Sequence, residues 1–175
     1  MGNPERYLEI APVFSTSGLP VPPFTDSDAA NRFLGRDPNA FLIGMVLDQQ
    51  IPAARAFAGP YLLQQRLGHL NPRKIAAMDP ADFLAVMTEK PAIHRFPASM
   101  AKRVQDACRV LVQEYGGKAN TIWDAQPDAR TVMQRLAVVP GIGATKQRLA
   151  MLLLGRYYGV DIPGWREAAP LRVPA

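Results

Sequence analysis

The sequence predicts an all-α fold, with about nine or ten helices in one compact multi-helix domain. Three observations favour this fold class. Apolar residues recur at spacings of three and four in several long segments, which is the period of a helix face. Helix-start signals, in which a capping residue precedes a proline, repeat along the chain. No segment alternates apolar and polar residues as a half-buried strand does.

The N-terminal elements follow from local signals. Residues 1–25 are rich in proline, serine and glycine, so we expect an N-terminal arm, with residues 26–175 forming the domain. A short first helix is expected to end before Gly35. Asp37 then supplies a cap and Pro38 the first helical position. The segment that follows is apolar all round, which predicts a largely buried helix.

The middle of the chain reads as four further helices. One runs from Pro52 towards Leu67, and we expect Pro60 to kink it. The cap-then-proline signal recurs at 71–72 and 79–80, which predicts two short helices. The strongest pattern runs from Pro97 to Gly116. Its apolar stripe consists of Met100, Val104, Ala107, Cys108, Leu111 and Val112.

A tight turn between two helical segments is the most informative motif. The first segment covers 128–138 and the second begins at Ala144. The pattern is typical of a helix-hairpin-helix DNA-binding motif, since glycines allow a close backbone approach and free N–H groups at a helix start bind phosphate. An ordinary turn between packed helices is the alternative. The candidate DNA-binding residues here are Pro140, Gly141, Ile142, Gly143, Thr145 and Lys146.

Composition narrows the possible partners and cofactors. A net charge of +5 suits an anionic partner without identifying one. One cysteine and two histidines predict no disulfide, no iron–sulfur cluster, no metal site and no cofactor. There is no membrane-length apolar run and no signal peptide, so we expect a cytoplasmic protein, nucleoid-associated if bacterial, with no membrane partner. We expect a monomer.

Three segments together resemble the endonuclease III-like DNA glycosylases of the helix-hairpin-helix–GPD superfamily. They are the hairpin 139–143, the long helix 99–116 that precedes it, and the early helix 41–50 with its Asp-Gln-Gln ending. The resemblance is closest to short actinobacterial members, which share the Asp-Gln-Gln and His-Arg-Phe-Pro stretches. It covers roughly residues 30–165.

This resemblance implies a base-excision repair protein that binds double-stranded DNA. Such enzymes flip a damaged base out of the stack and cut its bond to the sugar. Gln49 or Gln50 matches the position that fills the gap; alternatively, both cap the helix in a solvated loop. Arg95, Lys102 and Arg103 are expected to contact phosphates, although each alone also fits a solvated helix face.

The chain departs from the family pattern after the hairpin. The family's catalytic aspartate follows a valine, and Asp161 is the nearest match, although Pro163-Gly164 interrupts the expected helix and a plain loop aspartate is the alternative. Glu167 is a second catalytic candidate. Only ten residues follow Trp165, whereas most family members continue with further helices.

A lysine at a fixed place after the hairpin marks the bifunctional members of the family. Thr145 occupies that place here, and Lys146 is one residue on. Because one residue is a rotation of about 100° on a helix, we expect Lys146 to point at a phosphate rather than into the pocket. The resemblance therefore implies a monofunctional DNA N-glycosylase. The alternatives are a non-catalytic DNA-binding module of the same fold and a helical protein-interaction domain.

Overall fold

The computed structural model describes residues 3–174 and is all-helical, which confirms the predicted fold class. Within these residues the only β feature is an isolated bridge between Phe14 and Pro20. Ten α-helices and one short 3-10 helix follow one another along the chain. They are α1 (Arg6–Glu9), α2 (Asp28–Arg36), α3 (Pro38–Leu47), α4 (Ala53–Leu67), α5 (Pro72–Ala77), α6 (Pro80–Thr88), α7 (Pro97–Tyr115), η1 (Ala119–Ile122), α8 (Ala129–Ala137), α9 (Ala144–Tyr157) and α10 (Trp165–Ala168).

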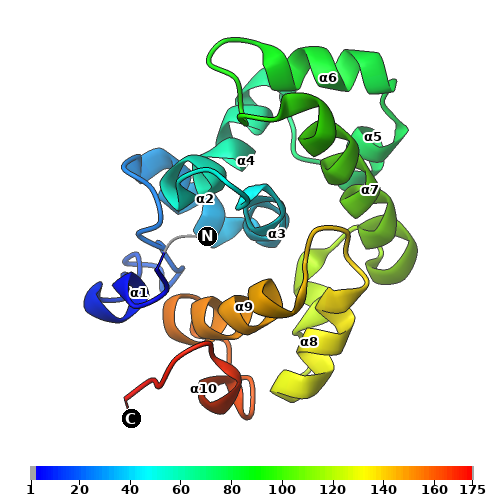
Figure 1. Ribbon diagram of the computed structural model, residues 1–175. Coiled ribbons are helices and arrows are strands. Elements are labelled where there is room, and N and C mark those ends of the chain that lie inside the picture. The colour runs from blue at the N-terminus through cyan, green and yellow to red at the C-terminus, as the bar shows by residue number, and fades with distance from the viewer. Residues whose placement is uncertain (1–2, 175) are drawn as a thin grey trace.

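Helix α3 occupies the centre of the molecule (Figure 1). It packs against α2, α4, α7 and η1, and every residue from Ala40 to Leu47 is buried. This segment is apolar all round because it is buried on every side, as the sequence predicts. Gly44 allows the closest approach, because a Cβ there would lie 2.5 Å from Cδ1 of Phe57 on α4.

The helix starts predicted from local signals are confirmed. The side chains of Asp37, Asn71, Asp79 and Asp128 each accept a hydrogen bond from a backbone N–H in the first turn of the helix that follows. Helix α2, which the sequence predicts as the first helix, differs from expectation because it continues past Gly35 to Arg36. A Cβ at Gly35 would lie 1.6 Å from the carbonyl oxygen of Pro20, so this glycine serves a close approach and not a helix end.

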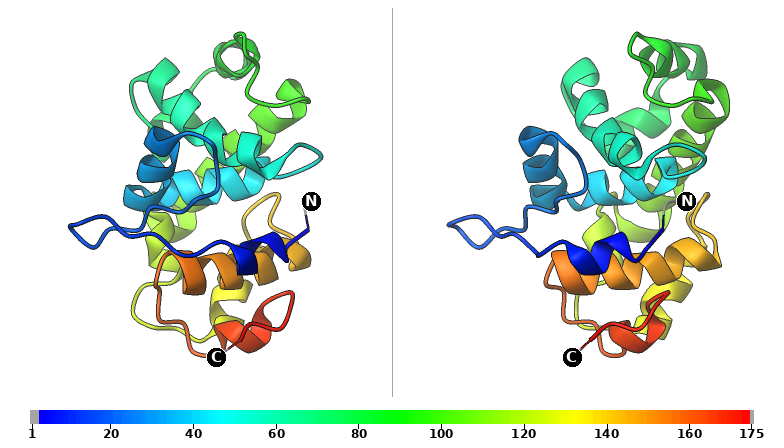
Figure 2. Two further views of the ribbon diagram at one scale, coloured as in Figure 1. Left: turned by 90° about the vertical axis from the view of Figure 1, so that its left-hand side faces the viewer. Right: turned by 60° about the vertical axis from the view of Figure 1, so that its left-hand side comes forward.

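The N-terminal residues pack on the domain through aromatic side chains. Tyr7 and Phe24 are buried, and their rings lie edge-on to the ring of Tyr157, with centroid distances of 6.1 and 5.2 Å. The Tyr157 hydroxyl donates to the carbonyl oxygen of Tyr7 at 2.6 Å. Between these contacts the segment runs along α9 and extends a loop away from the molecule (Figure 2). That residues 26–175 form a separate unit remains a prediction.

Among the described residues, no helix is long and apolar enough to cross a membrane.

Candidate functional site

The hairpin between α8 and α9 has the predicted form. Gly141 has a φ of +89°, which a glycine adopts without strain. Gly143 occupies the N-cap of α9 and has no side chain with which to cap it. The first N–H groups of α9 are therefore left for an external acceptor, as at other anion-binding helix starts.

The hairpin residues divide between core and surface. Ile142 is 3% exposed, and its N–H donates to the carbonyl oxygen of Val139 at 3.1 Å. Its side chain anchors the turn in the core, and a contact of Ile142 with DNA stays a prediction. Gly143 and Thr145 are exposed and Pro140 is half-buried, so the turn itself presents a surface to a ligand.

Arg103 on α7 joins the hairpin to the loop after α3. A Cβ at Gly141 would lie 2.9 Å from Cδ of Arg103 and 3.4 Å from Cγ1 of Val46, so the glycine lets the turn rest on both helices. The Arg103 guanidinium donates to Oε1 of Gln49. Three segments that the resemblance assigns to DNA contact therefore meet at one place.

His94 fixes the loop that contains Gln49. The imidazole is 1% exposed. Its Nδ1 accepts from the N–H of Phe96 at 3.0 Å, so the proton is on Nε2, which lies 3.1 and 3.0 Å from the carbonyl oxygens of Leu47 and Gln49. Burial lowers the pKa of His94, which keeps the ring neutral and the two loops joined. Gln50, at the tip, is exposed with a φ of +56°.

Lys146 points into the protein, and this corrects the expected orientation. The residue is 8% exposed, and Nζ donates to the carbonyl oxygen of Val46 at 3.3 Å. Burial lowers the pKa of Lys146 to about 8, against the opposing effect of the Asp48 charge. On α9 it is Lys146, and not the exposed Thr145, that faces α3. An inward, desolvated lysine is what amine chemistry requires.

Asp48 is the functional candidate that sequence reasoning missed. It follows the last residue of α3 and is 2% exposed. Its Oδ1 atom is buried and has no hydrogen-bond partner among the described residues. Burial raises the pKa of Asp48, while the charge of Lys146 lowers it. The sequence did contain a signal for Asp48. A carboxylate that directly follows an all-apolar helix is expected to be buried with that helix.

The predicted catalytic residues Asp161 and Glu167 lie elsewhere. Both are exposed. Asp161 follows the C-terminal end of α9, and Glu167 is on α10. Lys146 is in the first turn of α9 and Asp161 lies beyond its last residue, Tyr157, which is about 16 Å along the axis from Lys146. Asp161 is not brought to the hairpin, and Glu167 lines a pocket with Arg148 on α9, apart from Lys146. Their catalytic role stays a prediction.

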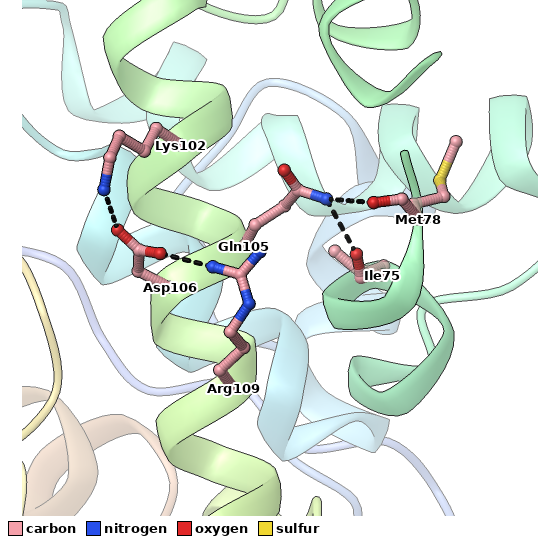
Figure 3. A network of polar contacts seen from close by, with 6 residues as sticks. All are labelled: Ile75, Met78, Lys102, Gln105, Asp106 and Arg109. Carbon is pink, nitrogen blue, oxygen red and sulfur yellow. Dashed lines mark hydrogen bonds and ion pairs between the residues drawn. The ribbon is translucent and has the colours of Figure 1, made fainter. Parts of the chain in front are cut away.

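The other two basic candidates, Arg95 and Lys102, make their contacts away from the hairpin. Arg95 is exposed and lies over the Phe96 ring, 5.3 Å from its centroid. Lys102 pairs with Asp106 at 2.7 Å, and Asp106 also accepts from Arg109 (Figure 3). Only Arg103 of these three contacts the hairpin, since the adjacent Lys102 faces another side of α7.

The rest of the network in Figure 3 holds the fold. Gln105 is 3% exposed, and its Nε2 donates to the carbonyl oxygens of Ile75 and Met78 at 3.0 Å each. Both acceptors are at the end of α5, and the Ile75 carbonyl oxygen also accepts from the N–H of Met78 at 3.2 Å. Within residues 3–174 no cluster of three or more histidine, cysteine or acidic side chains could hold a metal ion.

Comparisons with known proteins identify the fold. A non-covalent endonuclease III–DNA complex matches with a TM-score of 0.51 and 20% identity, over 71% of this chain and 50% of that one. 3-Methyladenine DNA glycosylase I from Staphylococcus aureus matches with a TM-score of 0.50 and 12% identity, over 90% of this chain and 88% of that one. The chain thus has a DNA glycosylase fold of the helix-hairpin-helix–GPD type, as the resemblance implied. It spans about half the length of the endonuclease III chain.

No family model matches the sequence, and no curated protein does.

Proposed function

We propose that this protein binds duplex DNA through its hairpin and releases a base by cleaving the N-glycosidic bond. The observation that carries the proposal is that Asp48 and Lys146 are both buried near the hairpin turn, close enough for the charge of each to shift the pKa of the other, although no ion pair joins them. Two titratable groups whose pKa values are shifted by burial and by each other are characteristic of acid–base sites. A glycosylase fold with an open hairpin supports the same conclusion.

Each group has a defined part in the proposed reaction. With a pKa of about 8, part of the Lys146 population is a neutral amine near neutral pH. Its Nζ can attack C1′ of the sugar as the bond to the base breaks, and the base leaves with the electron pair. The C1′–O4′ bond of the resulting aminal then opens, O4′ takes up a proton, and a covalent imine joins Nζ to C1′. Asp48 accepts the proton released from Nζ. If water attacks instead, Asp48 activates the water, and the product is a free abasic site.

DNA contacts follow from the surface of the same region. The free N–H groups at the start of α9 bind a phosphate, with Thr145 exposed beside them. Gln50 is exposed at the tip of its turn, whereas Gln49 is engaged by Arg103. Gln50 is therefore the residue proposed to fill the space left by a flipped base.

A base-release assay tests the proposal. Duplexes carrying uracil, alkylated, oxidised or mismatched bases are incubated with the protein, and borohydride is added in parallel to trap a covalent imine. We expect release of one class of base. If a trapped complex forms with wild type and with Lys102→Met but not with Lys146→Met, the amine chemistry belongs to Lys146. Release without trapping assigns the reaction to water and Asp48.

A non-catalytic DNA-binding module of the same fold is the second candidate. The observation that favours it is the exposure of Asp161, far along α9 from the hairpin. Salt-sensitive duplex binding with no base released from any substrate would support this candidate and refute the proposed enzyme. Absence of duplex binding even at low salt would refute both and leave a helical protein-interaction domain.

A further inference from the structure

A basic pocket lies between α9, α10 and the C-terminal segment, apart from the Asp48–Lys146 pair. Its volume is about 650 Å³. The residues that shape it are Arg148, Arg166, Glu167, Leu171, Arg172 and Val173. Three guanidinium groups therefore face one carboxylate, which leaves the pocket positively charged.

Arg148 is held in place at the pocket wall. Its Nε donates to the carbonyl oxygen of Ala168 at 3.1 Å, and its Nη2 donates to that of Ala169 at 2.8 Å. A guanidinium has five N–H donors, so the remaining donors stay available to a ligand. The two bonds also fix α10 against α9.

The other two arginines supply the rest of the positive charge of the pocket. Arg166 lies over the ring of Trp165, 4.6 Å from its centroid, and Arg172 is exposed on the C-terminal segment. Within residues 3–174 none of the ion pairs involves these arginines, so Glu167 does not neutralise them by direct contact. Uncompensated arginines grouped around a pocket favour an anion with several acceptor oxygens.

The pocket continues the surface of the hairpin. Thr145 and Arg148 are both exposed, and they are three residues apart on α9, which makes them neighbours about one turn apart. In both views of Figure 2 the C-terminal segment turns beneath the end of α9 that carries the hairpin. A strand held at the start of α9 can therefore reach the arginines without leaving this face.

We propose that this pocket is a second phosphate-binding site, which engages the DNA backbone next to the phosphate held by the hairpin. The inference rests on the proposed duplex binding and extends it to α10 and the C-terminal segment. Its partner is the sugar–phosphate backbone, so the contact adds affinity and orientation without reading sequence.

The test is the salt dependence of duplex binding. The double variant Arg166→Gln/Arg172→Gln removes two charges and spares Arg148, which supports α10. The control, Arg32→Gln/Arg36→Gln, removes the same formal charge from α2, which lies on the other side of α9 from α10 (Figure 1). The dissociation constant for an undamaged duplex is measured at 50 and 200 mM salt, conditions between which each phosphate contact changes affinity about threefold.

We expect the ratio of the two dissociation constants to fall about tenfold in the double variant, for two lost contacts, and much less in the control. If wild type binds duplex and both variants keep its salt dependence, the second site is refuted while hairpin binding stands. If wild type does not bind duplex, the proposed function fails as well. A titration of inorganic phosphate alone, followed by NMR, tests whether the ligand is DNA or a free anion. If the double variant loses phosphate binding but binds duplex as wild type does, the pocket binds a free anion and the inference is refuted.

Discussion

The two ends of α9 place ionisable residues in opposite environments. At the hairpin end, Lys146 and the neighbouring Asp48 are 8% and 2% exposed, and burial shifts the pKa of each towards its neutral form. At the other end, Asp161 lies in solvent. The helix thus carries a buried polar pair at one end and an ordinary surface carboxylate at the other.

This difference teaches that the position of a carboxylate in a motif is a weaker guide to chemistry than its surroundings. Asp161 follows a valine, as the family's catalytic aspartate does, whereas Asp48 belongs to the Asp-Gln-Gln stretch, to which the resemblance assigned no catalytic role. Asp48 has the desolvation and the charged neighbour that alter its proton affinity, whereas Asp161 is exposed. Four predictions test this contrast, in order of decreasing effect.

The two carboxylates should differ most in base release. Asp48→Asn keeps the size of the side chain and removes its proton affinity, so release should fall by a factor of about 10²–10⁴. Asp161→Asn should leave the rate unchanged. Both are measured as single-turnover release from the duplex that wild type cleaves. Equal losses, or a loss only in Asp161→Asn, would reverse the assignment.

The buried lysine should make stability depend on pH. The pKa of Lys146 is 10.5 in its ordinary state and about 8 in the folded protein, so the unfolded state binds more protons between these values. The free energy of unfolding should therefore rise by about 2 kcal/mol from pH 8 to pH 10. Urea unfolding of wild type and Lys146→Met at both pH values isolates this effect. A rise that persists in the variant would show that another group causes it.

A methyl group added at each end of α9 should have different consequences. Gly155→Ala places a Cβ 2.2 Å from Cδ2 of Trp165, so the indole must move, at a cost of about 1–3 kcal/mol. Gly141→Ala meets the flexible Arg103 side chain at 2.9 Å and has a φ of +89°, which costs about 1–2 kcal/mol.

Stability and duplex affinity, measured together, separate these two variants. Gly141→Ala should weaken duplex binding severalfold, because it displaces Arg103 from Gln49. Gly155→Ala should keep the contacts of the hairpin itself. If Gly141→Ala binds duplex as wild type does, the hairpin turn is structural only.

The smallest effect is expected where α9 meets the N-terminal residues. Tyr157→Phe removes the donor to the Tyr7 carbonyl oxygen and should cost about 1 kcal/mol of stability while leaving duplex affinity unchanged. Tyr61→Phe is the control, since the Tyr61 hydroxyl makes no hydrogen bond to the described residues. Thermal unfolding measures both. A loss of duplex binding in Tyr157→Phe would place function at both ends of α9.

The sequence by itself determined the class of fold, most helix starts and the hairpin. These features depend on residues that are neighbours in the sequence, such as the Asp37 cap before Pro38 and the glycines of 141–143. Such local interactions form whichever way the helices pack. The resemblance in three segments added the glycosylase fold, which the solved structures bear out.

Only the tertiary structure decided which side chains share a site. Lys146 contacts a carbonyl 100 residues earlier in the chain, and Asp48 owes its isolation to helices that close around α3. The rotation of α9 and the close approach of Gly35 to Pro20 likewise follow from packing between distant segments. Burial is a property of the assembled core, and because burial shifts the pKa values of Asp48 and Lys146, their chemistry could not be predicted from their neighbours in sequence.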